Sequence, residues 1–474
     1  MNKAKTSKSA THSTHSPQPA RIPVHECLPA FKRLLRQTQL KLAVEKESLG
    51  WYDRIFTPVV TLWCMIFQRL NHDHTLQAAV TDLHMGGADR LSSQQKAPLS
   101  TRIQSMATTA FSNARKRLPL ALFSAVLAAQ SQDIWDEARD GLWLGLRVLL
   151  LDGSQISLRP HPEIIARFEP SANQNGKAYW ALMQVVATFC LHTGAVVAST
   201  VGTIRVSEQD LACQQIRKGI KGGLYLGDRN FGVFQVVQCV LEANAHCLFR
   251  MSQSRANKIA GSARRIRRCG DYPICWNPSS YDRRHPNCSH ALQGRLLVAQ
   301  YSRPGFRTQW IYLFTTLTDA KTYSAQQLIE LYATRWQIEL NLRYLKTQMN
   351  LTQLDCKSPD MAEKEWMAGL MAYNLIRALM LAAALRKGIQ PNQLSFSATR
   401  RLLVQWLITA RTWDRLAASW DALLKRVAQI RQPTRSKPRP SEPRAKRHKR
   451  ETFPPLRGSR QVARKNLNNL VSKS

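Results

Sequence analysis

LWLGLRVLLLDGS, residues 142–154, is the stretch of sequence that decides the fold. Ten almost entirely apolar residues end abruptly at Asp152, a pattern typical of a strand that is buried on both faces and carries a carboxylate at its carboxyl end. Two further apolar runs, 179–191 and 195–201, are separated by a short polar break, which indicates a hairpin. These three runs predict the first strands of a sheet.

Helices alternate with strands after this hairpin. The range 207–219 starts with a serine cap and is amphipathic, which predicts a helix, and a short strand at 223–226 follows it. A second helix at 232–245 and a strand at 246–251 continue the series. The order of these elements predicts an α/β fold with a mixed sheet.

The chain of 474 residues is strongly basic, with 68 Lys and Arg, 31 Asp and Glu, and a formal net charge of +37. Its apolar fraction of 44% is enough for a folded core. A positive folded surface favours a polyanion as partner, with nucleic acid first and an anionic membrane surface as the weaker alternative. Because there is no apolar signal segment, no uninterrupted membrane span and no disulfide-like cysteine pattern, we expect a cytoplasmic protein without a membrane partner.

Composition divides the chain into regions. Both ends are basic and lack apolar periodicity, so we expect them to be disordered arms that follow phosphates, with plain solvated tails as the alternative. The predicted regions are a basic arm at 1–22, a helical N-terminal domain at 23–140 that binds DNA, an α/β domain at 141–390 with a β-rich insertion at 252–318, C-terminal helices at 391–430 and a basic tail at 431–474.

Two aspartates, Asp152 and Asp228, each follow a predicted strand. Neighbouring strand ends bring such side chains together, and two close carboxylates repel each other unless a cation neutralises them. Mg²⁺ and Mn²⁺ prefer oxygen ligands of this kind. The alternative is that each aspartate caps a turn or a helix.

A predicted long helix, from about 324 to 349, supplies a third carboxylate. With about 100° per residue, Arg335, Glu339 and Lys346 fall within roughly 60° of Tyr332 on one polar face. The alternative is an ordinary solvated face on which Glu339 pairs with Arg335 and Arg343.

The spacing of these residues is more specific than their geometry. Four of them form the pattern Y-x2-R-x3-E-x6-K, the YREK signature of bacterial insertion-sequence transposases: Tyr332, Arg335, Glu339 and Lys346. Asp152-Gly-Ser and Asp228-Arg-Asn-Phe match the settings of two catalytic aspartates in the same proteins. The chain therefore resembles the insertion sequence 4 family of DDE transposases over most of its length.

This resemblance implies a ribonuclease H-like catalytic core at 141–390 and a catalytic triad of Asp152, Asp228 and Glu339. The triad would hold two Mg²⁺ or Mn²⁺ ions, which cleave DNA at terminal inverted repeats and transfer the freed 3′ end to target DNA. The partner would be double-stranded DNA, the active form a dimer in a synaptic complex, and the location the bacterial nucleoid.

The resemblance also implies roles for other residues. Tyr332, Arg335 and Lys346 would hold phosphates of the transposon end, and Arg343 is a weaker candidate because it lies outside the signature. Some members of the family flip a base onto an aromatic ring of the insertion, which Trp276 or Trp310 would supply here, with core packing as the alternative role.

Two other functions remain open at the level of the sequence. A ribonuclease H-like nuclease or resolvase would use the same metal site without strand transfer. A non-catalytic DNA-binding regulator would keep the basic surface but would not need the three carboxylates.

Overall fold

The computed structural model describes residues 54–91, 97–173, 176–261, 268–285, 288–301, 309–409, 416–432 and 459–471. The predicted arm at 1–22 and most of the predicted tail at 431–474 lie outside these ranges. The chain divides into two compact units, and helix α16 (Arg460–Val471) belongs to the smaller one. All other elements below belong to the larger unit.

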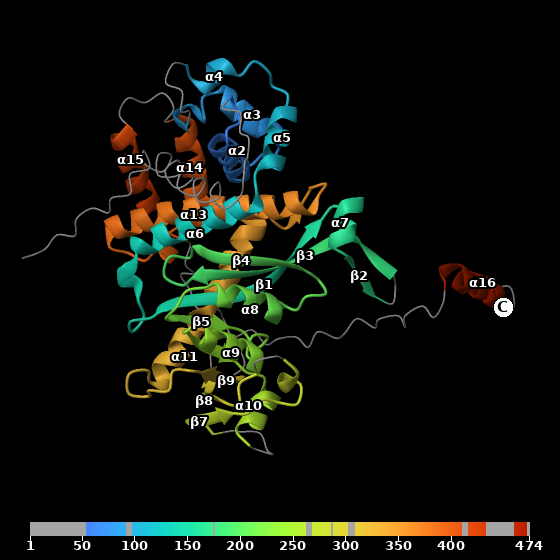
Figure 1. Cartoon of the computed structure of the whole chain (residues 1–474), viewed down its shortest axis with the longest axis vertical. Coiled ribbons are helices and arrows are strands. Elements are labelled where there is room, and N and C mark those ends of the chain that lie inside the picture. The colour runs from blue at the N-terminus through green and yellow to red at the C-terminus, as the bar shows by residue number, and fades with distance from the viewer. Residues whose placement is uncertain are drawn as a thin grey trace, which may run out of the picture. The chain divides into compact units, whose positions relative to one another are not determined.

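A mixed sheet forms the centre of the larger unit (Figure 1). Its first strands, in spatial order, are β4 (Val196–Thr203), β3 (Gly176–Cys190), β1 (Arg147–Leu158), β5 (Gly223–Gly227) and β6 (His246–Arg250). Strand β3 is antiparallel to β4 and to β1, whereas β1, β5 and β6 are parallel. Two short strands, β2 (Pro170–Asn173) and β10 (Gln353–Leu354), pair with β3 and β1. The predicted α/β fold with a mixed sheet is confirmed.

The predicted β-rich segment at 252–318 extends this sheet. It contains α10 (Gln253–Ile259), β7 (Gly270–Trp276), β8 (Leu292–Tyr301) and β9 (Gln309–Thr315). Strand β9 pairs antiparallel with β6, and the sheet continues in the order β6-β9-β8-β7. The segment is therefore continuous with the central sheet through backbone hydrogen bonds.

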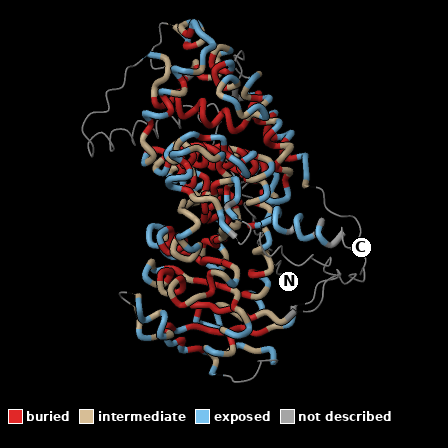
Figure 2. The backbone as a smooth tube through the Cα atoms, turned by 90° about the vertical axis from the view of Figure 1, so that its right-hand side faces the viewer, coloured by how far each residue is buried: buried red, intermediate tan, exposed pale blue. Residues whose placement is uncertain are grey.

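Helices cover both faces of the sheet, and the residues of β1 point alternately into the two cores that result. Val148 and Leu150 face a large cluster built from α2 (Pro58–Leu70), α6 (Leu120–Asp136), α13 (Pro359–Lys387), α14 (Phe396–Thr409) and α15 (Leu416–Gln429). Leu149 and Leu151 face α8 (Glu208–Arg217) and α9 (Phe234–Glu242). Burial on both faces explains the apolar residues 148–151, whereas Leu142 and Leu144 lie ahead of the strand and are exposed. The sequence predicts that the strand ends at Asp152, but it continues to Leu158, because the residues beyond Asp152 pair with β3 and β10. Figure 2 shows the buried backbone running through these layers.

The smaller helices complete the N-terminal part and the strand connections: α3 (Leu76–His84), α4 (Leu99–Arg102), α5 (Thr109–Arg117) and α7 (Pro162–Arg167). Helices α2, α3 and α5 contact one another, and α2 packs against α13. The described N-terminal and C-terminal helices therefore share one apolar core with a face of the sheet.

Helix α13 is the one described helix that is long and apolar enough to cross a membrane, and 83% of its most apolar window is buried inside the protein. Figure 1 shows α13 beside α6, over the sheet. Inside the core, Asn374 bonds the edge of β4: its Oδ1 accepts from the Val196 N–H at 2.8 Å and its Nδ2 donates to the Val196 carbonyl at 2.9 Å. The apolar surface of α13 is thus covered by protein.

The prediction of one continuous helix from about 324 to 349 is wrong in detail. Helix α11 (Ala325–Ala333) starts with a capping box and passes through a 3₁₀ turn (Thr334–Trp336) into α12 (Gln337–Arg343), which ends in a π turn (Tyr344–Gln348). The Thr334 hydroxyl donates to the Leu331 carbonyl at 2.7 Å, which competes with regular helical bonding at this point. The residues from Tyr332 to Lys346 therefore do not follow the regular spacing of about 100° per residue of a single α-helix.

Candidate active site

Asp152 and Asp228 lie next to each other on neighbouring strands. Leu151 of β1 pairs in parallel register with Gly227 of β5, and each aspartate comes directly after its member of that pair. Neighbouring strands lie about 4.8 Å apart, so the two side chains leave the sheet at the same place. Asp152 Oδ1 accepts from the Gly153 N–H at 2.9 Å and Asp228 Oδ1 accepts from the Asn230 N–H at 2.8 Å. Both carboxylates are therefore held by backbone donors.

Helix α12 packs against β1 and brings part of the YREK signature to these aspartates. Arg335 donates to Glu339 Oε1 at 3.0 Å, and its guanidinium carbon lies 6.0 Å from the centre of the Tyr332 ring. The Arg335 side chain is 18% exposed, whereas the Glu339 side chain is 65% exposed. In the described geometry Glu339 is thus an ion-pair partner of Arg335.

Arg335 interacts electrostatically with Asp152 as well as with Glu339. Burial raises the pKa of Asp152 to about 6, repulsion from Asp228 and Glu208 adds to the rise, and the Gly153 N–H and Arg335 oppose it. Burial opposes the charge of Arg335, but Tyr332, Asp152 and Glu339 outweigh burial and raise its pKa. Arg335 is therefore a cation held between carboxylates.

Tyr332 remains a neutral phenol. Burial raises its pKa to about 12, although Arg335 and Arg250 act in the opposite direction. A neutral phenol beside Arg335 is a hydrogen-bond donor.

Glu208 is a nearby carboxylate that the sequence analysis did not identify. It lies in the first turn of α8, where an acidic residue is ordinary, and its Oε2 accepts from Asn230 Nδ2 at 2.6 Å. Burial raises its pKa, and repulsion from Asp228 contributes. The hairpin β3–β4 separates Glu208 from Asp152 in the sequence, so no short motif connects the two residues. The one feature that could have indicated Glu208 is its position directly after the Ser207 helix cap.

The donor chemistry of this site fits a divalent cation. Carboxylate oxygens are the ligands that Mg²⁺ and Mn²⁺ prefer, and a bound cation would offset both the burial of Asp152 and its repulsion from Asp228 and Glu208, which raise its pKa. Within the described residues, no three Asp, Glu, His or Cys side chains are already arranged around one point. Asp152 and Asp228 are neighbours by strand register and supply oxygen ligands of the right kind, whereas Glu339 is paired with Arg335.

The remaining candidates differ in their surroundings. Lys346 is half-buried in the π turn, and Arg343 is exposed. Trp276 is 6% exposed, with its ring 5.7 Å from Phe234 and 5.1 Å from Phe314, which supports its alternative role in core packing and leaves no free face for a base. Trp310 is only partly buried in β9.

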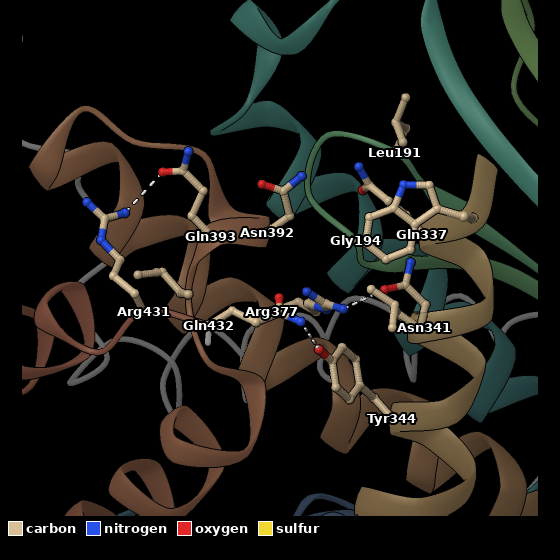
Figure 3. A pocket seen from close by; sticks show the side chains of 13 residues that line it. Leu191, Gly194, Gln337, Asn341, Tyr344, Arg377, Asn392, Gln393, Arg431 and Gln432 are labelled. Carbon is tan, nitrogen blue, oxygen red and sulfur yellow. Dashed lines mark hydrogen bonds between the residues drawn. The ribbon is translucent and has the colours of Figure 1, made fainter. Parts of the chain in front are cut away.

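A cavity of about 470 Å³ lies on another face of α12 (Figure 3). Arg377 reaches it from α13 and donates to Asn341 Oδ1 at 2.6 Å. The lining residues are Leu191, Gly194, Trp336, Gln337, Leu340, Asn341, Tyr344, Arg377, Asn392, Gln393, Leu394, Arg431 and Gln432. Because no carboxylate lines this cavity, it is separate from the metal site.

The raised pKa of Asp152 predicts an effect on stability. An acid whose pKa is higher in the folded than in the unfolded chain destabilises the fold when ionised, and the cost disappears as the pH falls through about 6 towards the ordinary value of 3.8. Without divalent metal, we expect Asp152→Asn to stabilise the protein by roughly 1–3 kcal/mol above pH 7, and by almost nothing near pH 4. Denaturant titrations of both proteins at several pH values measure this; a gain that does not change with pH would contradict it.

Comparisons with known proteins agree with this geometry. Residues 143–375, which include all three candidate carboxylates, match the transposase DDE domain family. The transposase InsG for insertion sequence element IS4 of Escherichia coli K12 is 29% identical over 309 residues, covering 64% of this chain and 68% of InsG. The putative transposase InsL for insertion sequence element IS186A, also of Escherichia coli K12, is 39% identical over 66 residues, covering 14% of this chain and 18% of InsL.

Among solved structures, the piggyBac transposase in a synaptic complex with hairpin DNA aligns with a TM-score of 0.41 and 13% identity, covering 86% of this chain and 87% of that one. The matched domain and the similarity to the IS4 transposase identify a DDE transposase, an enzyme that cuts and transfers DNA strands with divalent metal. The chain belongs to the insertion sequence 4 family of these enzymes, and its function is transposition.

Proposed function

We propose that this transposase cleaves the terminal inverted repeats of its own element and transfers the freed ends to target DNA by two-metal-ion chemistry. Asp152, Asp228 and Glu339 are the catalytic ligands, with Asp152 shared between the ions. The observation that carries the proposal is the parallel register of Leu151 and Gly227, which sets the two aspartates side by side. Mg²⁺ is the proposed ion, with Mn²⁺ as a substitute.

Two bound ions would activate the attacking oxygen and neutralise the leaving 3′ oxygen of an in-line displacement. Water is the attacking group at the end of the element, and the freed 3′ hydroxyl is the attacking group at the target. No protein side chain needs to act as a nucleophile, because both steps are the same displacement with a different oxygen. The aspartates, fixed by the N–H groups of Gly153 and Asn230, serve both steps without rearranging.

The positive residues of the signature hold the DNA. When Glu339 turns towards the aspartates, the guanidinium of Arg335 is released to bind non-bridging phosphate oxygens. The Tyr332 hydroxyl donates a hydrogen bond to a phosphate oxygen. Lys346 adds a point charge, and Arg343 contributes a more distant contact. Arg335 thus alternates between a carboxylate and a phosphate.

The wider assembly follows from the chemistry. Two ends must be held together, so we propose a dimer in the synaptic complex and a protein that works on the nucleoid. The helical domain at 23–140 binds DNA beside the catalytic domain at 141–390, and the C-terminal helices at 391–430 support α13. If excision passes through a hairpin, Trp310, which is only partly buried, is the better of the two tryptophan candidates for stacking a flipped base.

Product analysis tests the function. Full-length protein is incubated with Mg²⁺, a duplex that carries the ends of the element, and a supercoiled plasmid. We expect a nick or break at the junction of element and flanking DNA, followed by covalent joining of the 3′ end to the plasmid. Cleavage without joining would favour the nuclease or resolvase, and binding without cleavage would favour the regulator.

Removal of the basic tail predicts a change in salt dependence. Residues 433–474 carry thirteen Lys and Arg and two acidic residues. Each phosphate contact contributes about 0.9 to the slope of log K against log salt, so deletion of this segment should lower the slope by roughly 3 to 6 units. Deletion of 1–22, which has four Lys and Arg, should lower it less. Binding titrations from low to high salt measure both slopes; equal slopes before and after tail deletion would show that the tail does not contact DNA.

A further inference from the structure

Glu208 is the carboxylate near the site that the mechanism above leaves unused. It is half-buried at the start of α8, on a different element from Asp152, Asp228 and Glu339. Glu208 Oε2 accepts a hydrogen bond from Asn230 Nδ2 at 2.6 Å. The backbone N–H of the same Asn230 donates to Asp228 Oδ1 at 2.8 Å. One asparagine therefore connects Glu208 to the second catalytic aspartate.

Gln209 reinforces this connection. Its Nε2 donates to the Asn230 carbonyl at 2.9 Å and to Asn230 Oδ1 at 3.1 Å. With its side-chain oxygen bound by Gln209, the Asn230 amide directs its NH₂ group to Glu208. The carboxylate of Glu208 is thus held in one orientation beside the end of β5.

The Glu208 carboxylate lies against Gly153 of β1, with Oε1 nearer to it than Oε2. A Cβ atom built on Gly153 would lie 2.5 Å from Glu208 Oε1, closer than any real side chain allows. The absence of a side chain at Gly153 leaves the space that this oxygen occupies, directly after Asp152. Within the described part of the chain, no hydrogen bond to Oε1 is present. This oxygen, near two further carboxylates, is therefore available to bind a cation, which would relieve the repulsion among the three groups.

We propose that Glu208 is a fourth carboxylate of the active site, whose Oε1 binds the divalent ion held by Asp152 and Asp228, directly or through a water molecule. Glu208 Oε2 remains on Asn230 and keeps the group in place. The proposal rests on the metal site proposed above. It also explains the glycine after Asp152, because any larger residue there would displace the Glu208 carboxylate.

A purely structural role for Glu208 makes a different prediction. If Glu208 only anchored Asn230, a glutamine in its place would serve equally well, because the carboxamide oxygen accepts the same hydrogen bond without a charge. Glu208→Gln therefore separates the two roles. A matched control is Glu163→Gln, since Glu163 also lies in the first turn of a helix, is exposed, and carries the same charge.

The experiment measures Mn²⁺ binding to the full-length protein without DNA, by electron paramagnetic resonance of the free ion. We expect Glu208→Gln to weaken binding by about 10-fold or more, the effect typical of residues that support a metal site, and Glu163→Gln to leave it unchanged. Glu208→Asp, which keeps the charge on a shorter side chain, should recover part of the loss.

A double-mutant cycle tests the contact with Gly153 independently. Gly153→Ala should weaken Mn²⁺ binding about as much as Glu208→Gln does, because the new methyl group displaces the Glu208 carboxylate. In a Glu208→Ala background, where the space is free, Gly153→Ala should have little further effect. Thermal unfolding of each variant confirms that it is folded; if Gly153→Ala is not, the comparison of Glu208→Gln with Glu163→Gln still tests the proposal.

The Asp152→Asn variant distinguishes failure of the proposed metal site from failure of the proposed role of Glu208. If Asp152→Asn abolishes Mn²⁺ binding and Glu208→Gln binds like the unmodified protein, Glu208 is not a ligand and the site proposed above stands. If Asp152→Asn also binds Mn²⁺ normally, the proposed metal site itself is wrong. Additive effects in the cycle with Gly153 would likewise overturn the role of Glu208.

Discussion

Replacement of Asp152, Asp228 or Glu339 by alanine is expected to lower the rate of DNA cleavage by at least about a thousandfold, which corresponds to roughly 4 kcal/mol of lost transition-state stabilisation. The reason is that each carboxylate supplies charge and oxygen ligands that no neighbouring group replaces. Binding of DNA should persist in all three variants, because the phosphate contacts come from other side chains. Gel-based cleavage and filter binding on the same duplex measure the two effects separately.

Glu339→Ala has an additional expected result. Since Glu339 pairs with Arg335 at 3.0 Å, its removal frees a guanidinium and should leave DNA affinity equal or higher while cleavage is lost. Glu330→Ala is the control, because Glu330 is an exposed acid of α11 in the same helical run. Near-normal cleavage by any of the three carboxylate variants would show that the triad is assigned incorrectly.

The second large effect concerns stability. Glu365 of α13 is 7% exposed and forms ion pairs with two buried arginines, Arg69 of α2 and Arg115 of α5. Burial lowers the pKa of both arginines to about 10, which shows how costly these charges are without a partner. Glu365→Gln should therefore destabilise the protein by about 3–5 kcal/mol, because it leaves buried cations without a counter-charge.

An exposed ion pair provides the control for this prediction. Arg205 and Glu169 form a pair whose side chains are 75% and 40% exposed, so Glu169→Gln should cost at most about 1 kcal/mol. Denaturant unfolding followed by tryptophan fluorescence compares the two variants. A loss below about 1 kcal/mol for Glu365→Gln would mean that the two arginines find other partners.

Local pattern predicted the central strands well. Residues 147–151 are buried between two cores, as their composition indicates, and the hairpin that follows is the antiparallel pair β3–β4. These predictions succeed because a buried strand is a short run of consecutive apolar residues, which can be recognised without knowledge of the tertiary structure. The predicted bounds of the first strand are wrong: Leu142 and Leu144 are exposed ahead of it, and the strand continues through Asp152 to Leu158. The prediction of one regular helix failed where the Thr334 hydroxyl bonds the Leu331 carbonyl, a competition that apolar periodicity does not reveal.

The sequence by itself determined the family, the mixed-sheet fold and the choice of three candidate carboxylates, because the signature spacing and the acidic residues that follow short apolar runs are local features. Only the tertiary structure decided how these groups meet. The parallel register sets Asp152 beside Asp228, α12 directs Glu339 to Arg335, and the packing of α8 brings Glu208 to Gly153. The physical reason is that such contacts join residues far apart in the chain, and they depend on register and packing that no single stretch of sequence encodes.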